Sequence, residues 1–225
     1  DSLDEVMQKS LKPLSTAQFK ELKTEDPIIL DARPSGTFTQ GFVPGSISIG
    51  LDGRFAEWAG SLLPFDVPML LVAEPGKEKE SIVRLARVGL DKVQGYLDGG
   101  YEAWKNSGER SDLIIDVEAD ELMMDIPFDN NLVVVDVRKP AEYAEGHLKD
   151  ALNIPLSDLP DPGSMANIED RHNLYVHCAG GYRSVIAASM LKRQGIHNLR
   201  NIVGGWGKIK EQEKAEIVKE TSVLN

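Results

Sequence analysis

The sequence predicts an α/β protein made of two similar domains, each a mainly parallel sheet flanked by helices on both faces. Three features indicate this: motifs that recur once along the chain, short apolar runs of strand length, and intervening stretches with helical spacing of apolar residues. Strands that alternate with helices form crossover units and therefore parallel sheets. Ligands of such sheets bind beyond the carboxyl ends of the strands, so functional residues are sought there.

The repeat has a constant period of 105 residues. The matching positions are Asp31 with Asp136, Arg33 with Arg138, Gly41 with Gly146, and Gly99-Gly100 with Gly204-Gly205. A shared period that survives several loops is hard to obtain by chance. We therefore predict two homologous domains, residues 10–110 and 111–225.

Each half has the same kind of elements. Buried strands are predicted at Ile28–Leu30, Met69–Val72, Leu132–Val135 and Leu174–Val176. Ser15 and Gln18 form a capping box that opens a helix over Ala17–Leu22. Two further helices are expected to begin at Ser81 and Ser184 and to stop at Gly89 and Gly195. The charged stretch Lys208–Glu220 is predicted to be a solvated helix.

Composition narrows the classes of function. The net charge of −11 disfavours nucleic acid and anionic membrane surfaces as partners, and no apolar run approaches the length of a membrane span. The single cysteine, Cys178, excludes an intrachain disulfide and any CxxC site. It suits a reducing compartment, which predicts a cytoplasmic protein. The histidines lack the spacing of a ligand set, so neither a metal nor another cofactor is expected.

The chemistry is concentrated in one loop. The apolar strand 173–177 runs directly into Cys178-Ala-Gly-Gly-Tyr-Arg183, after which Ser184 is expected to begin a helix. Gly180 and Gly181 can adopt positive φ and turn successive backbone N–H groups inward as an anion cradle. The helix dipole and Arg183 add positive charge. A lone cysteine is by itself more often a small buried hydrophobe, but these surroundings favour a thiolate and hence a reactive thiol.

With these residues the chain resembles the tandem rhodanese-domain proteins, and the likeness covers nearly its whole length. Supporting motifs are Asp136-x-Arg138, Glu142-Tyr-Ala-Glu-Gly-His147 and Gly204-Gly205. The resemblance implies a sulfurtransferase in which Cys178 takes a sulfane sulfur from thiosulfate or a persulfide and passes it to a thiol or cyanide. Asp150 departs from the family, which often has glycine there.

The resemblance also assigns roles to residues. Cys178 is the catalytic nucleophile, and the loop residues bind the substrate: Ala179, Gly180, Gly181, Tyr182, Arg183 and Ser184. Asp136 and Arg138 are expected to form a structural ion pair, because Asp31 and Arg33 repeat it in the other half. His147 is expected to support the site, not to act as a base. A small-molecule sulfur donor and a thiol acceptor are the expected partners, with no nucleic acid and no membrane.

The first half lacks the nucleophile. Its strand Met69–Val72 leads into Ala73 and Glu74, one of which takes the place of the cysteine, and the loop is one residue longer. Glu74, Glu78 and Glu80 would repel a persulfide anion. We therefore expect the first domain to be catalytically silent.

Two alternatives remain open. The His177-Cys178…Arg183 pattern resembles cysteine-dependent phosphatases, which place five residues between Cys and Arg; here there are four, which favours sulfur over the larger phosphate. The segments around Leu11–Phe19 and Phe55–Gly60 resemble rhodanese pairs attached behind a metallo-β-lactamase-fold persulfide dioxygenase. In that case an upstream domain of the same polypeptide would exchange sulfur with Cys178, and this chain would be the C-terminal sulfur-relay or regulatory module of the fusion.

Overall fold

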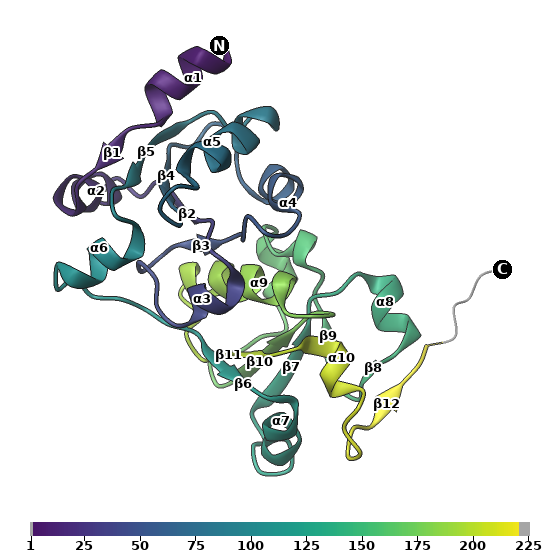
Figure 1. Cartoon of the computed structure of the whole chain (residues 1–225). Coiled ribbons are helices and arrows are strands. Elements are labelled where there is room, and N and C mark those ends of the chain that lie inside the picture. Colours follow the sequence, from purple (N-terminus) through teal and green to yellow (C-terminus); the bar gives the residue numbers. More distant parts are fainter. Residues whose placement is uncertain (1, 221–225) are drawn as a thin grey trace. The chain divides into compact units, whose positions relative to one another are not determined.

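The computed structural model describes residues 2–220, which fall into two units, residues 2–113 and 114–220. The five strands of the first unit are parallel and lie in the order β1-β5-β4-β2-β3 (Figure 1). They are β1 (Pro13–Leu14), β2 (Ile28–Asp31), β3 (Ile47–Ser48), β4 (Met69–Val72) and β5 (Val93–Leu97). Its helices are α1 (Leu3–Ser10), α2 (Thr16–Lys23), α3 (Ser35–Thr39), α4 (Phe55–Leu62), α5 (Glu78–Arg87) and α6 (Gly100–Asn106).

The second unit repeats this sheet in the order β6-β11-β10-β7-β9, again with every pair parallel. These strands are β6 (Ile115–Val117), β7 (Leu132–Asp136), β9 (Leu152–Asn153), β10 (Asn173–His177) and β11 (Leu199–Ile202). The helical elements are α7 (Ala119–Asp125), α8 (Pro140–Glu145), the 3-10 turns η1 (Leu156–Asp158) and η2 (Pro162–Met165), α9 (Tyr182–Arg193) and α10 (Gly205–Ile209). The α/β prediction of two sheets flanked by helices is confirmed.

Alternation of side chains along the strands explains the two-faced cores. In the first unit Leu70 of β4 packs with Phe19 of α2 and Trp104 of α6 on one face. In the second unit Tyr175 of β10 packs with Leu122 of α7 and Ile209 of α10 on the corresponding face. α9 covers the opposite face, where it contacts β10 and β11. The central strands β4 and β10 are thus buried on both sides, as their continuous apolar sequences require.

Local sequence fixes several helix ends. Ser15 and Gln18 form the predicted capping box at the start of α2, with bonds of 3.1 and 2.9 Å.

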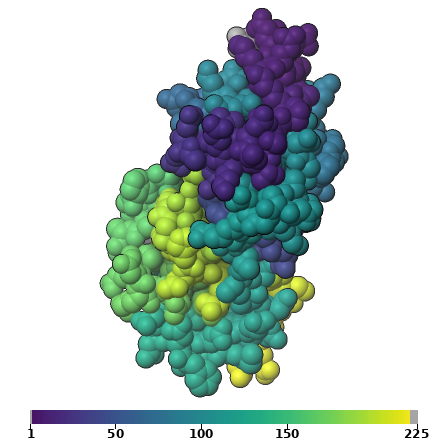
Figure 2. Space-filling view, turned by 90° about the vertical axis from the view of Figure 1, so that its left-hand side faces the viewer, coloured from purple at the N-terminus to yellow at the C-terminus, as the bar shows by residue number. Residues whose placement is uncertain are grey.

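The N-terminal helix α1 projects from the first unit, as its purple atoms show in the space-filling view (Figure 2). Only Val6 and Ser10 of α1 are buried, although the helix packs on α5 and β5.

Three predicted boundaries are wrong. α5 begins at Glu78 instead of Ser81, because the Ser81 hydroxyl donates to Lys77 O inside the first turn and caps nothing. α9 begins at Tyr182 instead of Ser184. The stretch Lys208–Glu220 is not a helix: α10 ends at Ile209, and the apolar pair Ile217–Val218 forms β12, which pairs antiparallel with β8 (His147–Leu148).

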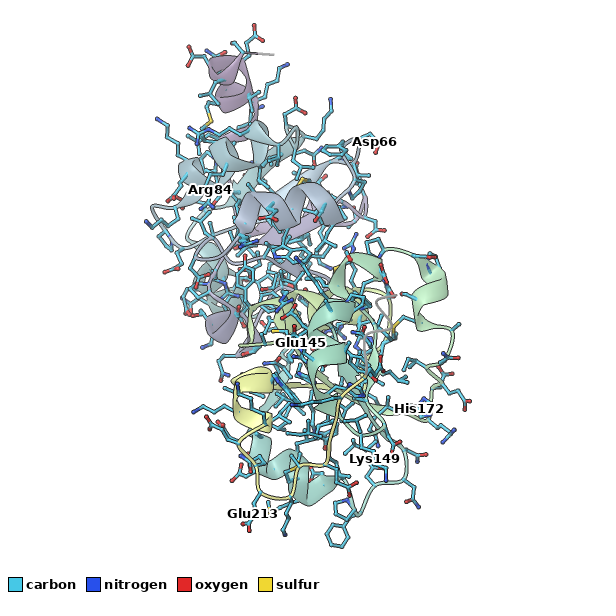
Figure 3. All side chains as sticks on the ribbon, turned by 90° about the vertical axis from the view of Figure 1, so that its right-hand side faces the viewer. Asp66, Arg84, Glu145, Lys149, His172 and Glu213 are labelled. Atoms are coloured by element: carbon cyan, nitrogen blue, oxygen red, sulfur yellow. The ribbon has the colours of Figure 1, made fainter. Side chains whose placement is uncertain are left out.

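The excess negative charge lies on the surfaces of both units. Figure 3 shows charged side chains extending outward, among them Asp66 of the first unit and Lys149 and Glu213 of the second. Within residues 2–220, no helix is long and apolar enough to span a membrane.

Candidate active site

Cys178 lies at the carboxyl end of β10, the central strand of the second sheet. β10 ends at His177, Cys178 follows directly, and α9 begins four residues later at Tyr182. Gly181 is the residue before the helix and has φ of 119°, which favours glycine. Gly180, also expected to adopt positive φ, does not. The left-handed turn at Gly181 therefore starts the helix, and Ser184 lies inside its first turn.

The sulfur of Cys178 is buried among polar groups. The residue is 1% exposed, but the Gly181 N–H donates to Sγ at 3.0 Å, and the thiol donates to Ser184 Oγ at 3.5 Å. Ala179 and Gly180, next in the chain, are exposed. A main-chain N–H aimed at sulfur stabilises negative charge there, in a thiolate or in a persulfide. The side chain is therefore buried and has one donor and one acceptor at its sulfur.

The Arg183 side chain points toward the carboxylate of Glu142. Its Nη1 and Nη2 donate to the two oxygens of Glu142 at 2.7 and 3.0 Å. This bonding lowers the pKa of Glu142 and raises the pKa of Arg183, the bidentate hydrogen bond being the largest cause in both cases. Arg183 therefore uses two of its hydrogen bonds on Glu142 of α8, and its charge also interacts with Cys178.

His177 braces the loop from the opposite face of the sheet. Its Nδ1–H donates to the carbonyl of Cys178 at 3.0 Å, and its Nε2 lies 3.6 Å from Asp136 Oδ2 without a hydrogen-bond partner among the described residues. Burial lowers the pKa of His177, so the ring is neutral at pH 7. Its ring stacks near Trp206, with 6.3 Å between centroids.

The motif Gly204-Gly205 lets the chain pack closely against the main chain of the Cys178 loop. Gly205 has φ of 55°, and a Cβ there would lie 2.8 Å from Ala179 O. This close approach lets the Trp206 N–H donate to Cys178 O at 2.7 Å and the Gly207 N–H donate to Ala179 O at 3.2 Å. The carbonyl of Cys178 is therefore held by both Trp206 and His177.

The repeated ion pair has the same geometry in both units. Arg138 Nη2 donates to Asp136 at 2.8 Å and to Gly146 O at 2.7 Å, and its guanidinium lies over the Trp206 ring. Arg33 binds Asp31 at 2.8 Å and Gly41 O at 2.9 Å, and lies over Tyr101. Both pairs are buried and tie a strand end to the following loop. Their presence in the unit without a cysteine fits a structural role.

His147 lies in β8 and Asp150 in the turn that follows this strand. The His147 ring stacks on Tyr143 at 3.6 Å between centroids, and its Nδ1–H donates to Tyr143 O at 2.8 Å. It thus supports α8. Asp150 has φ of 67°, a left-handed conformation that explains why glycine suits this position.

One cavity lies beside the cysteine loop. It has a volume of about 450 Å³, and its lining includes Ala179 of the loop, Trp206, Lys210 and Lys219. Tyr182, which the sequence places in contact with substrate, is half-buried at the first position of α9. Among the described residues, no three His, Cys, Asp or Glu side chains are grouped to hold a metal.

The register of the first sheet identifies the residue that replaces the cysteine. Asp31 pairs with Val72 as Asp136 pairs with His177, so Ala73 stands at the position of Cys178 and Val72 at that of His177. A cavity of about 180 Å³ near it is lined by Glu74, Lys77 and Glu80 among others. Acidic and basic side chains thus line this edge of the first sheet, and the catalytic silence of the first domain stays a prediction.

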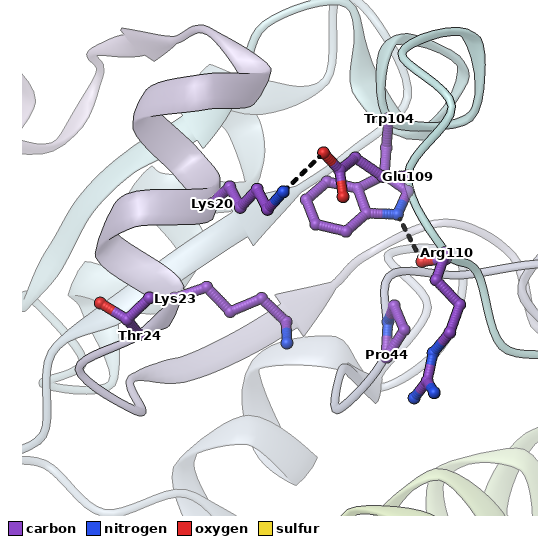
Figure 4. A pocket seen from close by; sticks show the side chains of 7 residues that line it. All are labelled: Lys20, Lys23, Thr24, Pro44, Trp104, Glu109 and Arg110. Atoms are coloured by element: carbon purple, nitrogen blue, oxygen red, sulfur yellow. Dashed lines mark hydrogen bonds and ion pairs between the residues drawn. The ribbon is translucent and has the colours of Figure 1, made fainter.

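Another cavity of the first unit, about 290 Å³, lies between α2 and the end of α6 (Figure 4). Lys20 pairs with Glu109 at 2.9 Å there, and the Trp104 indole donates to Arg110 O at 2.9 Å. The ion pair ties the segment after α6 back to α2.

Sequence reasoning missed two residues near the sulfur, Asn201 and Asp116. Asn201 Oδ1 accepts from Ser184 Oγ at 2.7 Å, and Asn201 Nδ2 donates to Asp116 Oδ1 at 2.9 Å. The sequence did contain one signal for Asn201. The equivalent residue of the first repeat, 105 positions earlier, is Tyr96, so an aromatic residue in one repeat is replaced by an amide in the other.

Comparisons with known proteins agree with the architecture. The model of the rhodanese-like domain family matches residues 15–107 and 118–212. A putative sulfur carrier protein of Bacillus subtilis is 29% identical over 101 residues, which are 45% of this chain and 54% of the relative. A sulfurtransferase of Allochromatium vinosum is 29% identical over 93 residues, 41% of this chain and 85% of the relative.

Among solved structures, a rhodanese-related protein of Thermoplasma volcanium matches with a TM-score of 0.41 and 29% identity. The match covers 47% of this chain and 99% of that protein. The thiosulfate sulfurtransferase of Pseudomonas aeruginosa matches with a TM-score of 0.41 and 18% identity, over 94% of this chain and 44% of that one.

Proposed function

Because the chain belongs to the rhodanese-like domain family, we propose that it is a sulfurtransferase that carries a sulfane sulfur on Cys178. The donor is thiosulfate or a persulfide, and the acceptor is a thiol or cyanide. The observation that carries this proposal is the Gly181 N–H aimed at Sγ, 3.0 Å away, on a loop that leads into α9. Relatives named as sulfurtransferases support it.

The reaction has two displacement steps on sulfur. The Cys178 thiolate attacks the outer sulfur of thiosulfate, an S–S bond forms to Cys178, and the donor's own S–S bond breaks so that sulfite leaves with the electron pair. Cyanide or a thiolate then attacks the terminal sulfur, and the electrons of the breaking S–S bond return to Cys178. Since the chain has no other cysteine, the acceptor comes from outside it.

The loop residues have distinct uses in this scheme. The Gly181 N–H stabilises the charged sulfur, and Ser184 Oγ lies within hydrogen-bond distance of it. Ala179 and Gly180, which follow Cys178, are exposed, and Tyr182 stands at the helix start beside them. Arg183 holds Glu142, and so fixes α8 against the loop.

The test is donor-dependent labelling of Cys178. We expect reduced protein treated with thiosulfate to gain the mass of one sulfur atom on the peptide that contains Cys178, and to release thiocyanate when cyanide follows. Cys178→Ser provides the matched control and should do neither. An aryl phosphate is offered in parallel. Phosphate release without any sulfur on Cys178 would replace the proposal with the phosphatase alternative.

A further inference from the structure

The cavity between α2 and the segment after α6 belongs entirely to the first unit, and the proposed function does not use it. It has a volume of about 290 Å³, which is near the lower end of the range for small-molecule sites. Its lining includes Lys20, Lys23, Pro44, Trp104, Glu109 and Arg110. The cavity is therefore large enough for a small organic ligand.

Two contacts fix the walls of this cavity. The Lys20 ammonium pairs with Glu109 at 2.9 Å, which ties α2 to the segment after α6. The Trp104 indole N–H donates to Arg110 O at 2.9 Å, which holds the main chain that carries the Arg110 guanidinium. Figure 4 shows both bonds. The walls are thus formed before any ligand binds, so binding orders few additional groups.

The charges around the cavity do not balance. Among the described residues that line it, three are cationic and one is acidic. Lys20 neutralises the acidic one, whereas Lys23 and Arg110 form no ion pair with any residue from 2 to 220. Lys23 is also half-buried, although lysine side chains without a partner usually extend into water. In a chain whose net charge is −11, this cavity thus has two cations that lack a partner anion.

The other prominent parts of the lining are apolar. The Trp104 and Pro44 rings lie across from α2 (Figure 4). Small-molecule sites typically combine such apolar walls with a few charged groups that fix the orientation of the ligand. An arginine guanidinium binds a carboxylate through two parallel hydrogen bonds. The lining therefore suits a carboxylate with an apolar body better than it suits an inorganic anion.

The second unit has apolar side chains at the equivalent positions. Leu14 of β1 and Val117 of β6 pair with strand residues that lie one period of 105 apart, so α2 and α7 correspond at a spacing of 103 residues. The equivalent residues are Met123 for Lys20, Ile126 for Lys23 and Ile209 for Trp104. Met123 and Ile209 are buried in one core cluster. A requirement of the fold would apply to both units, so the cations of the first unit need another explanation.

We propose that this cavity is a binding site for a small carboxylate with an apolar body. The carboxylate lies between the Lys23 ammonium and the Arg110 guanidinium, and the apolar body lies against Trp104 and Pro44. The site belongs to the unit that lacks a cysteine, and binding there needs no sulfur chemistry. The proposal is therefore independent of the proposed function.

The test follows the Trp104 indole N–H by nuclear magnetic resonance, with benzoate as the probe. The chain has three tryptophans, so a proton–nitrogen correlation spectrum has three indole signals, and Trp104→Phe identifies the one from Trp104. This N–H is bonded to Arg110 O, so it responds to a ligand held by Arg110. We expect benzoate to shift this signal, and not those of Trp58 and Trp206, in a saturable titration through the millimolar range.

Matched ligands and variants separate recognition of the charge from recognition of the ring. Benzyl alcohol has a similar ring without the charge, and acetate has the charge without the ring, so each should bind at least about tenfold more weakly. Lys23→Gln and Arg110→Gln each remove one cation and should weaken benzoate binding about tenfold. Lys79→Gln removes an exposed lysine of α5 outside the cavity and should leave the binding unchanged.

A Trp104 signal that does not move with benzoate would overturn the proposal. So would equal binding of benzoate and benzyl alcohol, because the cations would then have no role. Equal weakening by Lys79→Gln and Lys23→Gln would also overturn it, because the effect would then reflect the overall charge. The dispersed amide signals of each variant without ligand verify that it is folded.

Discussion

The two units have one scaffold and two different strand ends. Both sheets have the same strand order, and both bury an Asp-x-Arg pair that reaches a glycine carbonyl. They differ where β4 and β10 end: Val72 and Ala73 stand in one unit, His177 and Cys178 in the other. The comparison teaches that the fold depends on the ion pair and the glycines, whereas the chemistry depends on a few side chains at one edge.

Moving the cysteine from the second unit to the first tests most strongly whether the chemistry depends on the side chains around it. Cys178→Ala should lower thiocyanate production by about a thousandfold or more, because the nucleophile is gone. Adding Ala73→Cys to that chain should not restore activity, since Glu74 adjoins the new sulfur and Lys77, not a glycine with positive φ, precedes α5. Recovery to a tenth of the wild-type rate would show that the scaffold alone suffices.

The paired glycines offer the same substitution in both units. Gly205→Ala should destabilise the second unit by about 2–4 kcal/mol, because φ of 55° strains alanine and its Cβ would press on the Cys178 loop. Gly100→Ala, whose Cβ would lie 3.0 Å from Ala73 O, should cost the first unit about 1–2 kcal/mol. Urea unfolding with hydrogen exchange assigns each loss to its unit, and equal losses would contradict the tighter approach at Gly205.

The histidine of the second unit predicts a difference in pH dependence. The pKa of His177 is lowered by burial from its ordinary 6.5, so below that pH the unfolded chain binds a proton that the folded unit excludes. The stability of the second unit should therefore fall by up to about 1.4 kcal/mol per pH unit below pH 6.5. His177→Val, which copies Val72, should remove this slope in hydrogen-exchange measurements on β10. A slope that persists in the variant would assign it to other groups.

The smallest expected effect concerns the salt bridge between α8 and α9. Thr37 stands at the repeat position of Glu142, so this bridge belongs to the second unit. The pKa of Glu142 is lowered by Arg183 from its ordinary 4.5, so the stabilisation is complete above pH 4.5 and disappears as the pH falls below it. Glu142→Gln should cost about 0.5 kcal/mol at pH 7, because the pair is partly exposed, and nothing at low pH. Chemical denaturation at the two pH values checks this, and a loss independent of pH would contradict it.

The sequence predicts well what depends on neighbours along the chain. The apolar strands, the capping box at Ser15 and the repeated Asp-x-Arg pair are local patterns, and the structure contains them. Ser184 was misread as a helix cap because a serine before an apolar run has that appearance, whereas Gly181 makes the turn.

The rest of the site depends on tertiary contacts. Glu142 lies 41 residues from Arg183, and Asp116 lies 85 residues from Asn201. Spacing along the chain carries no signal for such partners, so the sequence did not reveal that Glu142 binds Arg183. The sheet register was also needed to choose between Ala73 and Glu74 as the substitute for the cysteine.

The depth of Cys178 has a consequence for when the protein reacts. The residue is 1% exposed, but its neighbours Ala179 and Gly180 are exposed. A second sulfur bonded to it would extend about 2 Å farther. Because the Cys178 carbonyl is anchored from two sides, that added length must be taken up by the side chain and the loop surface. A sulfane sulfur carried on Cys178 would therefore lie nearer to the surface than the cysteine sulfur itself does.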